Sequence, residues 1–203
     1  MPLSTTRLTL LAAALVSAAA LGGCDRGAGG SEQPAAKGGA GSATAGDGLG
    51  EHRTLTDRAG RPLPAAQVVA PDGRPAALAS LRGKPVLVNL WATWCAPCLA
   101  ELPTLNRLAT EMEGRAHVVA LAQDVNATHT ATRDFLKQRG WETIASWSDS
   151  ENKVGLEEGG NLPTTILYDA SGKETARVVG PLDWYSAEAR ELLRAAGFPP
   201  VEE

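Results

Sequence analysis

Apolar runs and segments with a helical period alternate through the middle of the chain. Residues 85–91 form a nearly continuous apolar run, which is typical of a strand buried on both faces of a parallel sheet. Apolar residues then recur with a helical period over 99–112, although Pro103 should kink this helix. A second strand at 117–122 and a second helix at 128–139 follow. A strand, a helix and a strand with short links predict a parallel crossover.

The flanking segments complete a mixed sheet. A strand at 66–70 and a turn at 71–74 predict a leading hairpin, and the turn at 169–172 predicts another hairpin near the other end. Further elements are expected at 78–82, 144–147, 152–156, 164–168, 174–179 and 186–196. The fold class is therefore α/β, with a mixed central sheet and helices on both faces.

The first 53 residues differ in composition from the rest. Residues 1–23 carry one charged side chain, Arg7, and a long apolar stretch, which is the layout of a secretory signal peptide. The sequence LGGC at 21–24 resembles the bacterial lipobox, so we expect cleavage before Cys24 and attachment of lipid to its sulfur. An uncleaved anchor and an ordinary signal peptide are the alternatives. The Gly- and Ala-rich segment that follows cannot bury a core. We expect three regions: a lipoprotein signal peptide at 1–23, a lipidated cysteine with a flexible tether at 24–53, and one folded domain at 54–203.

Charge and cysteine content narrow the possible partners. The chain has 19 Lys and Arg against 23 Asp and Glu, a formal net charge of −4. Such a mildly acidic chain lacks the basic stripe that binds phosphates, so we expect no nucleic-acid partner. The chain has three cysteines, and if Cys24 carries lipid, Cys95 and Cys98 remain as a pair.

That pair lies in the sequence Trp94-Cys95-Ala96-Pro97-Cys98, where the strand at 85–91 gives way to a helix. With two residues between them, both sulfurs can sit at the helix N-terminus, whose free N–H groups and dipole favour a thiolate on Cys95. Pro97 suits a first helical turn because its missing N–H costs nothing there. We therefore expect thiol-disulfide exchange, with Cys95 as the nucleophile and the more buried Cys98 as the resolving thiol.

The sequence gives less support to other roles for the cysteine pair. A zinc site needs about four ligands, whereas the chain has no second cysteine pair and its three histidines, at 52, 117 and 129, lack ligand spacing. A purely structural disulfide across so short a loop would constrain the unfolded chain little. We expect neither a bound metal nor a cofactor.

Three motifs carry a family resemblance. They are GKPVLVNLWATWCAPC at 83–98, ELP at 101–103 and NLPTT at 161–165. Together they resemble the thioredoxin fold and, more closely, the TlpA/ResA-like branch of membrane-tethered disulfide reductases. The leading hairpin and the additional strand and helix between 117 and 161 fit this branch better than plain thioredoxin.

The resemblance implies a substrate-binding surface beside the dithiol. Pro163 matches the proline that is cis in thioredoxin-like proteins, a bond type essentially restricted to X-Pro. In those proteins the main chain of the preceding residue, here Leu162, pairs with the substrate. Trp94, Ala96 and Pro97 would contribute to the same docking surface.

Two further positions concern proton transfer. Glu101 lies on the same helical face as Cys98, and the matching glutamate in ResA-like proteins is credited with handling the proton of the resolving thiol. The alternative is an acidic first-turn residue that only complements the helix dipole. Asn89 departs from thioredoxins, which carry an aspartate at this position. Because Asn cannot ionise, proton handling should shift toward Glu101 or water.

These observations predict a lipid-anchored monomer on the periplasmic side of the cell membrane, and Asp25 after Cys24 favours the inner membrane. The resemblance implies that it reduces protein disulfides, such as those of apocytochrome c or of copper-site cysteines. It also implies a membrane thiol carrier of the DsbD or CcdA type as electron donor. A disulfide oxidase or isomerase and a non-enzymatic tethered metal chaperone or binding module are the alternatives.

Overall fold

The computed structural model describes residues 42–44 and 49–202. The expected signal peptide, Cys24 and most of the expected tether lie outside these residues. None of the helices within them combines the length and the apolar character needed to cross a bilayer.

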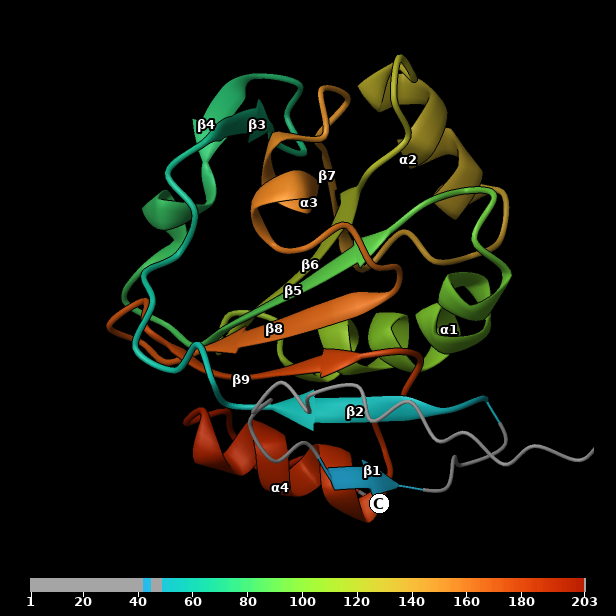
Figure 1. Ribbon diagram of the computed structural model, residues 1–203. Coiled ribbons are helices and arrows are strands. Elements are labelled where there is room, and N and C mark those ends of the chain that lie inside the picture. Colours follow the sequence, from blue (N-terminus) through green and yellow to red (C-terminus); the bar gives the residue numbers. More distant parts are fainter. Residues whose placement is uncertain (1–41, 45–48, 203) are drawn as a thin grey trace, which may run out of the picture. The chain divides into compact units, whose positions relative to one another are not determined.

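One mixed sheet runs through the described residues (Figure 1). Its strands are β1 (Ser42–Thr44), β2 (His52–Leu55), β3 (Gln67–Val69), β4 (Pro75–Ala77), β5 (Val86–Trp91), β6 (His117–Ala122), β7 (Ala145–Ser148), β8 (Thr164–Tyr168) and β9 (Glu174–Val179). Their order across the sheet is β1-β2-β9-β8-β5-β6-β7-β3-β4. The helices are α1 (Ala96–Glu111), α2 (His129–Lys137), α3 (Lys153–Glu157) and α4 (Ala187–Ala195), together with the 3₁₀ helix η1 (Leu78–Leu81).

Strand β5 lies in the interior of the sheet, as its apolar sequence predicts. All six of its residues are buried. It runs parallel to β6 and antiparallel to β8, and β6 runs parallel to β7. Helices α1 and α2 make the crossovers between the parallel strands. The carboxyl ends of β5, β6 and β7 therefore meet at one edge of the sheet.

Helices cover both faces of the sheet. Successive residues of a strand point to opposite faces, so Leu87 and Trp91 join a core with α1, α2 and α4. Val88 and Leu90 join a second core with η1 and α3. Each fully buried side chain of this size stabilises the fold by about 1.5–3 kcal/mol. The expected mixed α/β architecture is confirmed.

The expected hairpin and inserted element are both present. Strands β3 and β4 pair antiparallel, and β3 also reaches the edge of β7 through Val69 and Ser148. Strand β7 and helix α3 lie between β6 and β8 in the chain, where the additional strand and helix were expected.

The sheet begins earlier than the sequence predicts. Strand β2 starts at His52 and pairs antiparallel with β9, and β1 pairs with β2. Both strands include residues that we expected to belong to a flexible tether ending at 53. The physical reason is that β2 covers the edge of β9, whose main-chain N–H and C=O groups would otherwise remain unpaired. Two side chains of β2 also bind α4, since His52 Nε2 and Thr54 Oγ1 lie 3.1 and 2.7 Å from the carboxylate of Glu188.

Candidate active site

The two cysteines lie where β5 passes into α1. They form a disulfide, with their Cα atoms 5.3 Å apart. Cys95 is the N-cap residue of α1, and its Sγ accepts a hydrogen bond of 3.3 Å from the main-chain N–H of Cys98. Pro97 lies in the first turn of this helix, as expected. Cys98 is completely buried, whereas 6% of the surface of Cys95 is exposed. The cysteine that keeps some exposure is thus the one at the helix N-terminus, where an anion is stabilised.

The loop before β8 approaches the same edge of the sheet. Strand β8 pairs with β5 through Thr164 and Leu90, so the preceding residue, Pro163, falls at the carboxyl end of β5. The peptide bond between Leu162 and Pro163 is cis, as the resemblance implied. Pro163 is buried and Leu162 is half-buried. The sheet therefore brings this loop to the end of the strand that leads to Cys95.

Glu101 belongs to a buried polar cluster. Its side chain is completely buried, and so is that of Asn89. Asn89 Nδ2 donates hydrogen bonds of 2.6 Å to Glu101 Oε1 and 2.9 Å to Thr165 Oγ1. The main-chain N–H of Leu182 donates to Glu101 Oε2 at 3.1 Å. A carboxylate that lacks water needs such donors, and Glu101 is therefore not a solvated first-turn acid that merely complements the helix dipole.

Sequence reasoning missed the contact between Asn89 and Glu101. The two residues are twelve positions apart and come from a strand and a helix, so only the packing of α1 on β5 brings them together. The unusual amide at 89 was the signal available in the sequence. The structure gives it a role as a hydrogen-bond donor to the carboxylate.

The loop that carries Trp94 is fixed by Asp124, which sequence reasoning also missed. Asp124 follows β6 and is mostly buried. Its carboxylate accepts from the main-chain N–H of Thr93 at 3.1 Å and from Thr93 Oγ1 at 2.5 Å. Trp94 itself is 71% exposed, whereas Trp91 is completely buried and packs on Phe135 with ring centroids 5.8 Å apart. The loop thus presents Trp94 to solvent beside the disulfide.

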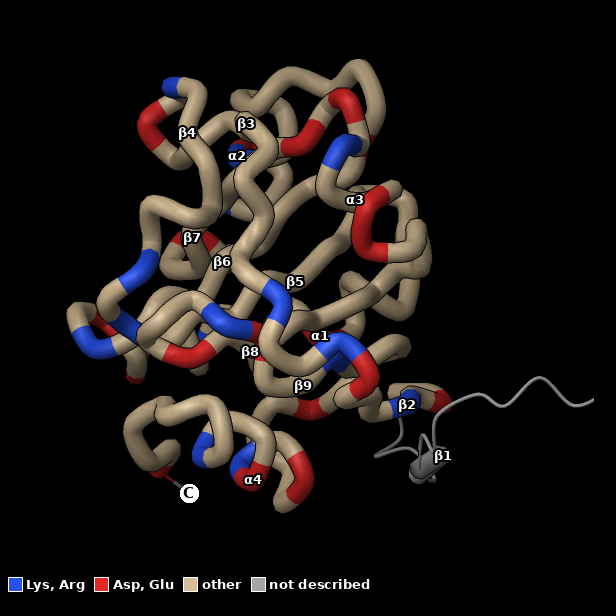
Figure 2. The backbone as a smooth tube through the Cα atoms, turned by 60° about the vertical axis from the view of Figure 1, so that its left-hand side comes forward, with Lys and Arg blue, Asp and Glu red and all other residues tan. Residues whose placement is uncertain are grey.

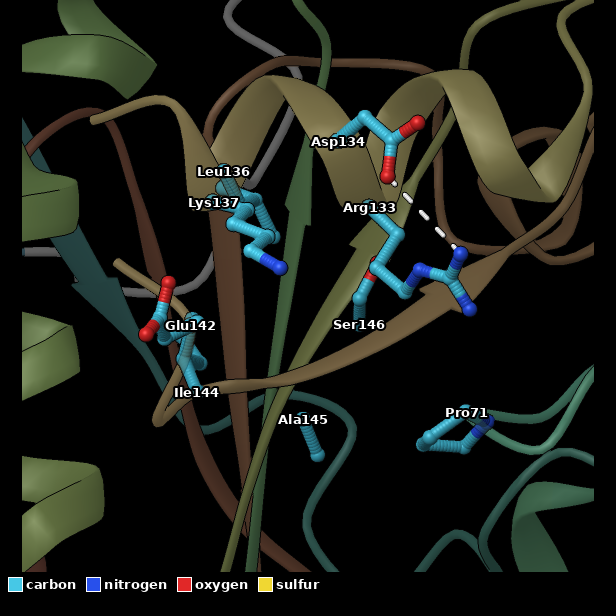
Figure 3. Close-up of a pocket in the computed structure, with 9 residues that line it drawn as sticks. All are labelled: Pro71, Arg133, Asp134, Leu136, Lys137, Glu142, Ile144, Ala145 and Ser146. Atoms are coloured by element: carbon cyan, nitrogen blue, oxygen red, sulfur yellow. Dashed lines mark ion pairs between the residues drawn. The ribbon is translucent and has the colours of Figure 1, made fainter. Parts of the chain in front are cut away.

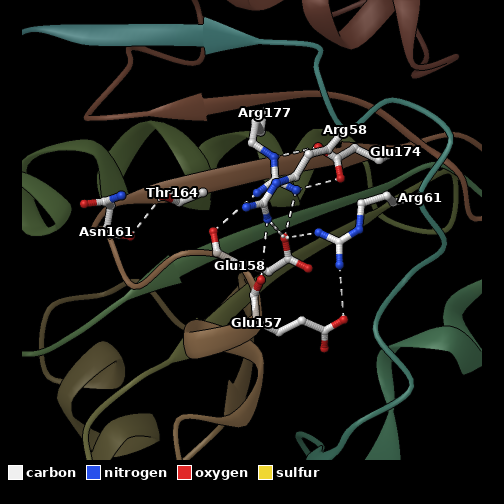
Figure 4. Close-up of polar contacts among 8 residues, drawn as sticks. All are labelled: Arg58, Arg61, Glu157, Glu158, Asn161, Thr164, Glu174 and Arg177. Carbon is white, nitrogen blue, oxygen red and sulfur yellow. Dashed lines mark hydrogen bonds and ion pairs between the residues drawn. The ribbon is translucent and has the colours of Figure 1, made fainter. Parts of the chain in front are cut away.

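A buried ionic cluster holds the chain ahead of the cis peptide bond (Figure 4). Arg177 on β9 donates two hydrogen bonds of 2.7 Å to Glu174 and one of 2.8 Å to Glu158 Oε2. All three side chains are more than nine-tenths buried. Arg58 and Arg61 reach the same oxygen of Glu158 at 3.3 and 3.6 Å. The chain between α3 and β8 is therefore anchored at Glu158 to β9 and to the segment after β2.

The protonation states in this cluster follow from its geometry. Burial alone would lower the pKa of Arg177, but the hydrogen bonds to Glu174 and Glu158 outweigh burial and raise it above its usual value. Burial raises the pKa of the neighbouring Tyr168, and the charges of Glu158 and Glu174 raise it further. Arg177 is therefore charged and Tyr168 neutral at physiological pH.

Comparison with known proteins identifies the chain. A family model described as Redoxin matches residues 58–193. The chain belongs to the Redoxin family. Among its relatives is the thiol-disulfide oxidoreductase ResA of Bacillus thuringiensis (strain Al Hakam), 31% identical over 121 residues, which cover 60% of this chain and 69% of that protein. The thiol:disulfide interchange protein DsbE of Pseudomonas aeruginosa is 34% identical over 127 residues, which cover 61% of this chain and 68% of that protein.

A solved structure supports the assignment of this chain to the Redoxin family. The crystal structure of a thiol:disulfide interchange protein of the thioredoxin family from Chlorobium tepidum TLS superposes with a TM-score of 0.55 at 28% identity. The match covers 68% of this chain and 97% of that one. The expected resemblance to the TlpA/ResA-like branch is confirmed, and with it the thioredoxin-like fold. The protein is a thiol-disulfide oxidoreductase.

A cavity of about 340 Å³ in this Redoxin-family enzyme lies between α2 and β7, away from the predicted site residues (Figure 3). It is lined by Pro71, Arg133, Asp134, Leu136, Lys137, Glu142, Ile144, Ala145 and Ser146. None of these is a residue to which the sequence assigns a role in exchange. Within residues 49–202, no three His, Cys, Asp or Glu side chains form a cluster suited to a metal ion.

Proposed function

We propose that the chain is a membrane-tethered periplasmic oxidoreductase that reduces protein disulfides through Cys95 and Cys98. The observation that carries the proposal is the unequal placement of the two sulfurs. Cys95 caps α1 and retains some exposure, whereas Cys98 is completely buried behind it. This arrangement suits a first thiol that meets the substrate and a second that acts only after the first has reacted.

The reaction has two exchanges. The Cys95 thiolate attacks one sulfur of the substrate disulfide, forms a mixed disulfide and releases the other substrate sulfur as a thiolate. Cys98 then loses its proton and attacks Cys95 Sγ, which releases the second substrate thiol and leaves the Cys95–Cys98 disulfide. Two electrons have passed to the substrate. A two-electron donor must then reduce the pair before the next cycle.

Three groups of residues support these steps in the proposal. Glu101 accepts the proton of Cys98, and its burial within α1 and its hydrogen bond from Asn89 support that role. The main chain of Leu162, ahead of the cis Pro163, pairs with the substrate. Trp94, Ala96 and Pro97 form the docking surface around Cys95, which the 71% exposure of Trp94 supports.

Location and partners complete the proposal. The lipobox-like sequence at 21–24 supports lipid attachment at Cys24, and Asp25 after it supports residence on the periplasmic face of the inner membrane. There the chain, as a monomer, receives electrons from a membrane thiol carrier of the DsbD or CcdA type. Its substrates are disulfides of apocytochrome c or of copper-site cysteines.

The test of the proposal measures both activity and direction. The reduced full-length chain should reduce the disulfides of insulin, and Cys95→Ser should abolish this activity. Equilibration with glutathione should give a reduction potential below about −200 mV, on the reducing side of the protein disulfide isomerase range. A potential near about −120 mV, that of a strong disulfide oxidant, would assign the chain to disulfide formation instead.

A further inference from the structure

The cavity between α2 and β7 has an apolar floor and polar walls that the exchange reaction does not use. Leu136 and Ile144 line it, and each is 1% exposed. Its volume of about 340 Å³ lies at the lower end of the range of small-ligand pockets, about 300–1,000 Å³. The cavity therefore has the size for a small molecule that carries an apolar part.

Hydrogen bonds at both ends of α2 hold the walls of the cavity in place. At the start of α2, His129 Nδ1 and Thr132 Oγ1 each lie 3.0 Å from Ser148 Oγ on β7. After the end of α2, Asn106 Oδ1 accepts a hydrogen bond of 3.1 Å from the main-chain N–H of Thr143. The cavity is therefore formed before any ligand binds, which is usual for small-ligand sites.

Ser146 on β7 brings a hydroxyl group without a partner to this cavity. Its side chain is 6% exposed, and its Oγ has no hydrogen-bond partner among the described residues. A buried hydroxyl without a partner is uncommon in folded proteins. This hydroxyl therefore indicates that a bound molecule supplies the missing partner.

The main chain of Ser146 lies at an open edge of β7. The N–H of Asp149 donates to a carbonyl of β6, and alternate residues of a strand turn their main-chain groups to opposite sides, so those of Ser146 point away from β6. On that side, among the described residues, β3 pairs with β7 only through Val69 and Ser148. Pro71 stands where the next pair would form, and it has no N–H. An open strand edge of this kind binds the amide groups of a peptide.

Two side chains of opposite charge on the cavity wall lack an ion-pair partner. Within residues 49–202, neither Lys137 nor Glu142 forms an ion pair. Elsewhere such charges do pair. Figure 2 shows acidic and basic positions side by side around α3, where Glu151 lies 3.0 Å from Lys153. The charges of Lys137 and Glu142 are therefore available to a ligand.

The positions of the charges indicate a ligand with separated charged ends. In Figure 3 the carboxylate of Glu142 and the guanidinium of Arg133 lie at opposite ends of the cavity, and Ser146 lies between them. The pair of Arg133 with Asp134, at 3.7 Å, is half exposed and contributes little, so it does not prevent Arg133 from binding an anion. A single amino acid carries its ammonium and carboxylate on one carbon atom. A dipeptide separates the two groups by a peptide bond and fits this arrangement better.

We propose that the cavity between α2 and β7 binds a short apolar peptide with free ends, of the size of a dipeptide. The ammonium group faces Glu142, and the carboxylate faces Arg133 and Lys137. The amide bonds to Ser146, and an apolar side chain contacts the floor of the cavity. The site is separate from the cysteine pair, so this binding activity goes beyond the proposed exchange function and does not depend on it.

The test measures the binding of Leu-Leu to the full-length chain by isothermal titration calorimetry. The wild type should bind with a Kd of about 0.1–1 mM, as expected for a ligand of this size. Free leucine cannot reach both ends of the cavity, and N-acetyl-Leu-Leu-amide lacks both charges. Each should therefore bind about tenfold more weakly than Leu-Leu.

Variants of the cavity assign each end of the peptide. Glu142→Gln should weaken the binding of Leu-Leu about tenfold but not that of N-acetyl-Leu-Leu, which has no ammonium group. Lys137→Gln should weaken Leu-Leu about fivefold and spare Leu-Leu-amide, which has no carboxylate. Ser146→Ala should weaken Leu-Leu about fivefold without lowering stability in urea unfolding, because its hydroxyl has no partner in the fold. Glu51→Gln and Lys173→Gln remove exposed charges outside the cavity and should leave the Kd unchanged.

Several results would overturn the proposal. They are no binding of Leu-Leu to the wild type at about 10 mM, or an unchanged Kd in all three cavity variants. Leucine that binds as tightly as Leu-Leu would assign the cavity to single amino acids, and a blocked peptide that binds more tightly would assign it to the interior of a longer chain. Insulin reduction by Cys95 and Cys98 should be the same in every cavity variant, so the proposed exchange function is tested separately.

Discussion

At the residue scale, the carboxylate of Glu101 accepts hydrogen bonds from two other segments of the chain. Asn89 donates to one carboxylate oxygen, and the main-chain N–H of Leu182 donates to the other. These donors favour the charged form, while burial disfavours it. A carboxylate under such opposing influences, one helical turn beyond Cys98, is suited to accept and release a proton.

The substitution Glu101→Gln tests this role. The attack of Cys98 on the mixed disulfide should slow about 100-fold, which is a typical effect of removing a general base. Stability should fall by about 1–3 kcal/mol, because the amide cannot accept from both Asn89 and Leu182 and one buried donor remains unpaired. Rapid-mixing measurement of substrate thiol release between pH 5 and 9 gives the rate, and urea unfolding gives the stability.

A matched control is Glu111→Gln on the same helix, where the glutamate binds Tyr185 near the surface. It should leave the rate of release unchanged. If Glu101→Gln released substrate at the wild-type rate across this pH range, Glu101 would have no part in the proton transfer.

At the scale of elements, the sequence predicted the parts of the fold whose own residues determine them. Strand β5 is a nearly continuous apolar run, and apolar residues recur with a helical period in α1. Each sequence pattern therefore predicts that its element is buried. Strands β1 and β2 were not predicted because their pairing depends on the free edge of β9 rather than on apolar residues of their own. The bonds from Asp124 to Thr93 were not predicted either, since they require the register between β5 and β6.

The ionic cluster behind the cis peptide bond allows a second prediction. Glu158→Gln removes a charge from a buried group of Arg177, Glu174 and Glu158 and should lower the free energy of unfolding by about 3–5 kcal/mol. Glu157→Gln is the control, because its exposed pair with Arg61 contributes only about 0–1 kcal/mol. Urea unfolding of both variants measures the difference. Equal losses in the two variants would show that the buried cluster does not stabilise the chain segment before β8.

At the scale of the whole molecule, lipid attachment at Cys24 would confine the exchange site to the membrane surface. Cys24→Ser should move the chain from the membrane fraction to the soluble periplasmic fraction, because the acyl chains supply the stable anchoring. Insulin reduction by the purified variant should match that of the wild type, since Cys95 and Cys98 are unaltered. Fractionation followed by immunoblotting measures the distribution, and a variant that stays with the membrane would contradict lipid attachment at Cys24.

The central claim is that Cys95 is the sulfur that bonds to the substrate and Cys98 the sulfur that releases it. The most direct measurement is mass spectrometry of the full-length Cys98→Ser chain after reaction with an oxidised protein substrate. The account predicts a stable mixed disulfide on Cys95, absent from the wild type after completed turnover and absent when Cys95 is also replaced by Ser. A covalent complex that forms without Cys95, or no complex in Cys98→Ser, would contradict it.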